Sequence, residues 1–155
     1  MRSFFFILSL VTLSLLGTAQ MRRVYVDHDE NNWIKKIDFY APSQGYVAFT
    51  YWIGFTTDSG KTFQRKYIDL NNVDYNGYFP GLTFGFGING IKAFDQNHLV
   101  VYGDYAFEPS ILYSSDGCNT FKLIYYHNYG VDHLTGGVTD MVFPQDNLTG
   151  YAGWR

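Results

Sequence analysis

Cysteine and charge are both scarce in this sequence of 155 residues. Cys118 is its only cysteine, so no disulfide can form within the chain and core packing must hold the fold together. Nothing in the sequence places a base such as His127 beside this thiol, so we expect a small, partly buried turn residue rather than a nucleophile. Charged residues make up 16% of the chain, against roughly 25% in an ordinary soluble domain. The net charge of −3 gives no electrostatic basis for binding nucleic acid.

Long apolar segments are also rare, and the one present lies at the N-terminus. Residues 4–16 form a run of 13 apolar and small residues after Arg2, and Gly17 and Ala19 occupy the −3 and −1 positions of a small-residue cleavage site. This layout predicts a signal peptide over residues 1–19, cleaved near Ala19, and an extracytoplasmic protein. A membrane helix needs about 20 apolar residues, so a short membrane anchor is the less favoured alternative, and no stable membrane span is predicted.

Aromatic residues and glycine are abundant, with 14 tyrosines, 14 phenylalanines and 16 glycines. Aromatic side chains suit a pleated, half-buried surface, and glycine supplies the positive φ angles of tight turns. No segment after the N-terminal run has the apolar spacing of an amphipathic helix. The composition therefore predicts an all-β fold.

Two segments of the chain repeat each other. Residues 53–63 and 111–121 align without a gap, which places Asp58 and Asp116 at equivalent positions 58 residues apart. Each aspartate lies in a predicted tight turn between two strand-like runs. A repeat at such a period is typical of an architecture built from stacked units.

The flanking segments extend this repeat. Phe39, Phe94 and Phe143 each end a short apolar stretch, which a polar loop and a strand-like run follow. One unit then reads strand, loop, strand, longer link, strand, tight turn, strand, which outlines a four-stranded antiparallel sheet. The third unit reaches only its second strand at Arg155, so we expect the N-terminal part of a longer repeat array. The expected units cover about residues 33–70, 88–128 and 138–155 (incomplete).

The aspartate turns resemble the Asp-box, or BNR repeat, with the pattern S/T-x-D-x-G-x-T-[WF]. The matching residues are Thr56, Asp58, Gly60, Thr62 and Phe63 in the first copy, and Ser114, Asp116, Thr120 and Phe121 in the second, where Cys118 replaces the glycine. An aspartate that opens a turn accepts hydrogen bonds from backbone N–H groups that would otherwise be unpaired. The resemblance implies antiparallel four-stranded blades of a β-propeller, about two blades plus the start of a third, with each box a structural hairpin away from the ligand face.

Three groups of proteins carry such boxes: sialidases, sortilin-type receptors and exported propellers similar to photosystem II assembly factors. A sialidase site uses an arginine cluster and a Tyr/Glu pair, and none of the later arginines lies in a sialidase motif: Arg22, Arg23, Arg65 and Arg155. The resemblance therefore favours an exported, non-catalytic propeller that acts as a scaffold or binding module for protein or glycan. The alternatives are the N-terminal part of a sialidase-like glycoside hydrolase with its catalytic residues outside this chain, and a degenerate fragment without a function of its own.

The links between units are the expected ligand-binding segments, because binding surfaces lie on loops held by a rigid scaffold. Exposed aromatic side chains there can stack on a sugar or hold a peptide. The pattern predicts no metal, cofactor or catalytic residue, and it requires the remaining blades or self-association to close a ring. The ligand-face candidates are Tyr78, Phe79, Tyr129 and His133.

Overall fold

The computed structural model describes residues 32–77, 85–105, 107–127, 136–144 and 149–154. These residues form three β-sheets and one short 3₁₀ helix, η2 (Leu70–Asn72), so the prediction of an all-β fold is confirmed. The predicted signal peptide over residues 1–19 and all four ligand-face candidates of the sequence lie outside the described residues. Within the part that the structure describes, no helix is long and apolar enough to cross a membrane.

Sheet 1 is a four-stranded antiparallel sheet whose spatial order follows the chain. Its strands are β1 (Ile34–Ala41), β2 (Gln44–Phe49), β3 (Ile53–Thr56) and β4 (Gln64–Lys66). The first aspartate turn connects β3 to β4. The strand order within this sheet is the one that the repeat predicts.

Sheet 2 repeats that arrangement and adds one strand at its edge. Its antiparallel strands are β6 (Phe86–Ala93), β7 (Leu99–Tyr105), β8 (Glu108–Ser114) and β9 (Phe121–Tyr126). The short strand β5 (Val73–Asp74) pairs in parallel with β9 and covers its outer edge. The sequence did not predict β5, because two residues are too short to show a strand period.

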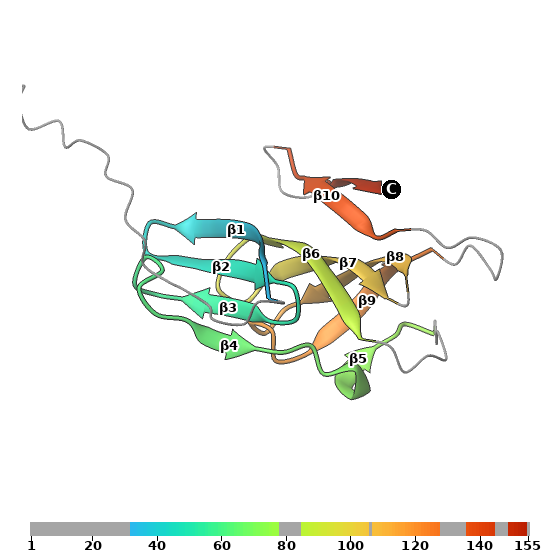
Figure 1. Ribbon diagram of the computed structural model, residues 1–155, viewed down its shortest axis with the longest axis horizontal. Coiled ribbons are helices and arrows are strands. Elements are labelled where there is room, and N and C mark those ends of the chain that lie inside the picture. The colour runs from blue at the N-terminus through green and yellow to red at the C-terminus, as the bar shows by residue number, and fades with distance from the viewer. Residues whose placement is uncertain (1–31, 78–84, 106, 128–135, 145–148, 155) are drawn as a thin grey trace, which may run out of the picture.

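Sheet 3 is an antiparallel hairpin of β10 (Val138–Val142) and β11 (Tyr151–Trp154). These strands lie where the repeat predicts the first two strands of a third unit. In Figure 1 this hairpin and sheet 1 lie on different sides of sheet 2, which occupies the middle of the molecule.

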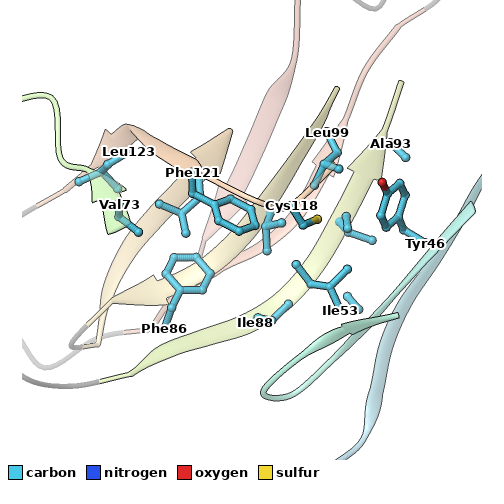
Figure 2. Close-up of a cluster of buried hydrophobic side chains, with 14 of the residues drawn as sticks. Tyr46, Ile53, Val73, Phe86, Ile88, Ala93, Leu99, Cys118, Phe121 and Leu123 are labelled. Atoms are coloured by element: carbon cyan, nitrogen blue, oxygen red, sulfur yellow. The ribbon is translucent and has the colours of Figure 1, made fainter. Parts of the chain in front are cut away.

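The main hydrophobic core lies between sheets 1 and 2. Tyr46 and Ile53 project from sheet 1 towards β6, where Tyr46 lies near Ala93 and Ile53 near Ile88, as Figure 2 shows. Asp38 of β1 also bridges the two sheets, because its carboxylate accepts the backbone N–H of Ala93 at 2.6 Å. The core members from sheet 2 that are at most 2% exposed are Ile88, Ile91, Ala93, Leu99, Val101 and Leu112.

A second core lies between sheets 2 and 3, and it uses equivalent positions. Cross-strand pairs are equivalent when they stand at the same place in the ladder, counted from the aspartate turn. On this count the pair Tyr46–Phe55 corresponds to Val100–Tyr113, and Ala48–Ile53 corresponds to Tyr102–Ile111. The first set packs towards sheet 2, and the second packs towards sheet 3 around the fully buried Val138. Each sheet therefore presents the same face to the sheet that follows it in the chain.

A β-bulge recurs at one place in the first strand of every sheet. The register skips one residue in each of β1, β6 and β10, and the skipped residues are Lys35, Asn89 and Thr139. A bulge shifts the alternation of side chains by one position. Two apolar residues three positions apart therefore face the same side of each sheet: Ile34 and Ile37, Ile88 and Ile91, Val138 and Met141.

Sheet connections differ from the prediction in one respect. The prediction of a longer link between the second and third strands of each unit is wrong. Only residues 50–52 connect β2 to β3, and only residues 106–107 connect β7 to β8. The strands themselves extend through most of the expected link. The longer connections instead lie between the sheets.

The three phenylalanines that mark the repeat do not occupy one structural position. Phe39 lies over Gly45 and Phe143 lies over Gly150, since a Cβ on either glycine would lie within 2.7 Å of the phenylalanine ring. Phe94 lies beyond the end of β6 and meets the Phe143 ring edge-on, with 5.0 Å between ring centroids. It therefore packs at the interface between sheets 2 and 3. This is the opposite face of sheet 2 from the one that the alignment with Phe39 predicted.

Three glycine backbones meet beside the bulge of β6, which provides a test of this packing. A Cβ on Gly103 would overlap the carbonyl oxygen of Gly87, and a Cβ on Gly137 would lie 2.7 Å from the Gly103 carbonyl. We expect Gly103→Ala to destabilise the fold by about 1–3 kcal/mol, the usual cost of overpacking. Gly153→Ala is the matched control in a strand, because nothing lies within 4 Å of its Cβ position. Equal denaturant midpoints for the two variants would contradict the close approach.

Candidate functional site

The first aspartate turn is a closed network of hydrogen bonds. The Asp58 carboxylate accepts the Thr62 backbone N–H at 2.9 Å and the Thr62 hydroxyl at 2.7 Å. The Thr56 hydroxyl donates to the same carboxylate at 2.9 Å and accepts the Gly60 N–H at 3.0 Å. Phe63 continues from the turn into a cluster with Trp52 on the face of sheet 1 that points away from sheet 2. The predicted turn residues thus bond mainly to one another.

The second aspartate turn repeats this network residue by residue. Asp116 accepts the Thr120 N–H at 2.9 Å and the Thr120 hydroxyl at 2.6 Å. The Ser114 hydroxyl donates to Asp116 at 2.9 Å and accepts the Cys118 N–H at 3.0 Å. Phe121 then enters the core between sheets 1 and 2 and is 4% exposed.

The replacement of glycine by Cys118 leaves the turn geometry intact. Both turns need two consecutive residues with positive φ, which are Ser59 and Gly60 (62° and 82°) in the first and Gly117 and Cys118 (67° and 68°) in the second. Each turn therefore places its glycine at a different one of the two positions. The Cys118 side chain is 3% exposed and belongs to the main core, as expected of a structural residue.

Each turn is also clipped to the hairpin that precedes it. The Ser59 N–H donates to the Ser43 carbonyl at 2.9 Å, and the Gly117 N–H donates to the Asn97 carbonyl at 3.0 Å. The hydrogen bonds from Thr62 hold the pKa of Asp58 below its ordinary value of 3.8, at about 2. A carboxylate held ionised by its own turn is a poor general acid at neutral pH. The aspartate turns therefore have the geometry of structural clips.

The opposite ends of the sheets carry two cavities that meet at the recurring bulge. Strand directions alternate, so the connections at residues 50–52 and 106–107 lie at the ends remote from the aspartate turns. Lys35 and Asn89, the extra residues of the bulges in β1 and β6, line both cavities. Thr139, the extra residue of the third bulge, lines the second cavity.

The first cavity has a volume of about 410 Å³ and lies between the start of β6 and the connections of sheets 1 and 2. Its walls combine two exposed aromatic rings with one carboxylate and one ammonium group. Its lining residues include Lys35, Thr50, Tyr51, Asn89, Asp104 and Phe107.

Asp104 is the half-buried carboxylate of this cavity. Burial raises the pKa of Asp104 above its ordinary value, while a hydrogen bond from the Phe107 backbone N–H and the charge of Lys35 act in the opposite direction. The carboxylate lies over the backbone of Gly87, where a Cβ would be 2.7 Å from its Oδ1. Glycine at position 87 therefore leaves room for the acid.

The second cavity, of about 400 Å³, lies along the first strands of all three sheets. Lys36 of β1 and Asp140 of β10 approach each other to 3.4 Å across it, and the Tyr102 hydroxyl donates to the same carboxylate oxygen at 3.4 Å. A hydrogen bond from the Met141 N–H and the charge of Lys36 lower the pKa of Asp140. Asn89 adds a further link, because its amide nitrogen donates to the Val138 carbonyl at 3.0 Å. We name these two adjoining spaces, lined by Lys35, Lys36, Asn89, Asp104, Thr139 and Asp140 among others, the bulge cavities.

A third cavity of about 510 Å³ lies elsewhere, at the outer edge of sheet 2. It lies between η2 and β5 on one side and β9 with the second aspartate turn on the other. Of the described residues, only those of η2 and of sheet 2 with its turn line it, so the repeat does not build it. We therefore take the bulge cavities as the candidate site.

Sequence reasoning missed the bulge cavities because it searched the longer links between units. A signal was present, since apolar residues at a spacing of three within a strand require a bulge to share one face. That spacing occurs in residues 34–37, 88–91 and 138–141. In the part of the chain that the structure describes, no group of three or more His, Cys, Asp or Glu side chains is placed to hold a metal ion.

Two comparisons with known proteins found no match to this chain. No protein-family model matches it, and no curated protein matches it in a sequence search. The functional argument therefore depends on the geometry of the site.

The hydroxyl of Thr62 provides a direct test of the aspartate turn. We expect Thr62→Val to raise the pKa of Asp58 from about 2 towards 3.8, because one hydroxyl donor is lost while the backbone N–H bond remains. A lowered pKa in the folded state gives stability that is present above pH 3.8 and is lost as the pH falls towards 2. The variant should therefore show a shallower loss of melting temperature over that window.

Carboxyl NMR titration gives the pKa directly. Thr62→Ser is the matched control, because it keeps the hydroxyl and should keep the wild-type pKa. An unchanged Asp58 pKa in Thr62→Val would show that the hydroxyl bond contributes nothing to the turn.

Cys118 gives a test of core burial. Burial raises the pKa of its thiol from 9.0 to about 12, so almost no thiolate exists at pH 8. We expect an aromatic disulfide reagent to leave the native protein unlabelled and to label one thiol per chain in denaturant. Rapid labelling of the native protein at pH 8 would place Cys118 outside the core.

Proposed function

We propose that this chain forms blades of an exported β-propeller that acts as a non-catalytic binding module, with the bulge cavities as its ligand site. Sheets 1 and 2 have the strand order of propeller blades, and sheet 3 supplies the first two strands of another. The first strand of sheet 2 contacts the first strands of both other sheets, as inner strands around a common axis do. The two aspartate turns correspond to Asp-boxes on the face remote from the ligand.

The recurring bulge supports this function most strongly. Bulges occur next to functional sites because they redirect a side chain that regular pairing would fix. Here the same bulge occurs three times, and its extra residues Lys35, Asn89 and Thr139 all line adjoining cavities. A scaffold without a ligand would need no cavity at this repeated position.

The outer face of sheet 1 supports a further blade next to it. Ile34 and Ile37 are 53% and 55% exposed, whereas the equivalent Ile88 and Ile91 of sheet 2 are 2% and 1% exposed beneath sheet 1. A blade that covers this face comes from further repeats of a longer chain or from a second copy. Either source extends the row of bulges.

One observation favours the alternative of a glycoside hydrolase. Asp104 has a raised pKa and Asp140 a lowered one, and such a pair is typical of an acid and a base in adjoining positions. Asp140, however, already accepts hydrogen bonds from Lys36 and Tyr102. We therefore favour binding without turnover.

Glycan and peptide arrays probed with the intact chain test the binding module. We expect binding to at least one array component, weakened about tenfold by Lys35→Ala, which removes a side chain shared by both cavities. Lys61→Ala is the matched control, because Lys61 is an exposed lysine of the first aspartate turn.

Two results would contradict the binding module. Binding that is equally strong in Lys35→Ala and in the control would place the ligand elsewhere. Release of reducing ends from a bound glycan, abolished by Asp104→Asn, would establish the hydrolase instead.

A further inference from the structure

The mouth of the first bulge cavity carries two large aromatic rings that the fold leaves in solvent. Tyr51 is 60% exposed on the connection from β2 to β3, and Phe107 is 62% exposed on the connection from β7 to β8. These rings come from two different sheets and line one cavity. Paired aromatic rings beside polar groups are a feature of small-molecule sites, where the rings supply apolar contact and the polar groups fix orientation.

The backbone of Phe107 is strained in the described structure. Its φ is 69°, a left-handed conformation that is a genuine outlier for a bulky residue. Glycine or asparagine would satisfy a two-residue turn without this cost. Burial of the ring in the core does not offset this cost, because the ring remains 62% exposed. Strain that persists at a ligand site without a packing reason points to a role for the side chain itself.

A polar residue that lines the cavity also holds this turn in place. Asp104 accepts the Phe107 N–H, so the same carboxylate both holds the strained residue and borders the cavity. Lys35 and Asn89 add an ammonium group and an amide. Hydrogen-bond donors and acceptors of both charges therefore line the same cavity as the two aromatic rings.

This combination selects among ligand classes. An acidic sugar or a phosphate would meet the carboxylates of Asp104 and Asp140 at close range, and among the described residues no arginine lines either bulge cavity. An extended peptide that adds a strand needs a regular unpaired edge, whereas the cavities lie where bulges at Lys35, Asn89 and Thr139 interrupt the edge strands β1, β6 and β10. A neutral sugar is the most complementary ligand for this site. Each of its hydroxyls both donates and accepts hydrogen bonds, and the C–H face of its ring stacks on an aromatic side chain.

We propose that the first bulge cavity binds a neutral pyranose unit of a glycan between Tyr51 and Phe107, with Asp104, Lys35 and Asn89 bonding to its hydroxyls. The second bulge cavity, which shares Lys35 and Asn89, receives the next unit of the same glycan against Lys36, Thr139 and Asp140. This ligand class depends on the proposed binding function, and it adds the chemistry of the ligand to that function.

Titration of the intact chain with neutral oligosaccharides tests the ligand class. The probes are cellopentaose, maltopentaose and mannopentaose, with tetragalacturonic acid as the acidic counterpart, and binding is followed by saturation-transfer NMR and calorimetry. We expect at least one neutral pentasaccharide to bind, with signal transfer strongest at ring C–H protons. Tyr51→Ala should weaken that binding about tenfold and Tyr51→Phe should retain it, because stacking needs the ring.

Phe107→Gly separates binding from folding. Glycine relieves the positive φ, so this variant should melt at a higher temperature than the wild type and yet lose the oligosaccharide. Tyr67→Ala is the control, because Tyr67 is an aromatic residue of similar exposure, 59%, that lines neither bulge cavity.

Four outcomes overturn the ligand class. Neutral sugar binding that survives both Tyr51→Ala and Phe107→Gly places the sugar elsewhere. Tighter binding of tetragalacturonic acid, lost in Lys35→Ala, shows an acidic ligand, and binding of array peptides alone shows a protein ligand. Both of those results leave the binding module standing. No binding to any probe or array component overturns the ligand class and the binding module together.

Discussion

The one extra residue in the first strand of each sheet decides how the sheets stack. Residues that alternate along a regular strand point to opposite faces, so Ile88 and Ile91 would lie on different sides of β6. The bulge at Asn89 brings both isoleucines into the core beneath sheet 1, where they are 2% and 1% exposed. The same shift brings Val138 and Met141 together against sheet 2. The bulge therefore accounts both for the stacking of the sheets and for the cavities, because the unpaired residue of each bulge lines a cavity.

The aspartate turns stabilise the short strands at the other end of the sheets. A hairpin of two short strands is marginal alone, and β4 has only three residues. The Asp58 network fixes the turn internally, and the bond from Ser59 to Ser43 ties it to the neighbouring hairpin. The rigid end and the bulged end therefore have separate roles. The end with the bulge cavities can include strain and exposed rings because the other end holds the strands in place.

The sequence predicted the parts of this fold that depend on local chemistry. The turn pattern around Asp58 and Asp116 located two hairpins, since carboxylate capping and positive φ leave a residue signature. Phe94 was misplaced because register, not residue type, decides its position: Phe39 pairs with Gly45, whereas Ala93, one residue before Phe94, pairs with the equivalent Leu99. The site itself escaped prediction for a related reason. Asp104 lies within a strand and Phe107 in a two-residue connection, so neither resembles a binding loop until the sheets are stacked.

Three non-glycine residues in the left-handed region show how backbone strain and burial relate in this molecule. Cys118 takes a φ of 68° and directs its side chain into the main core, so burial of the thiol offsets the backbone cost. Asn76 takes a φ of 52°, which its residue type tolerates, and its N–H bonds to Asp74. Phe107 has neither compensation from burial nor a tolerant residue type. Its ring, which is 62% exposed, instead lines the first bulge cavity.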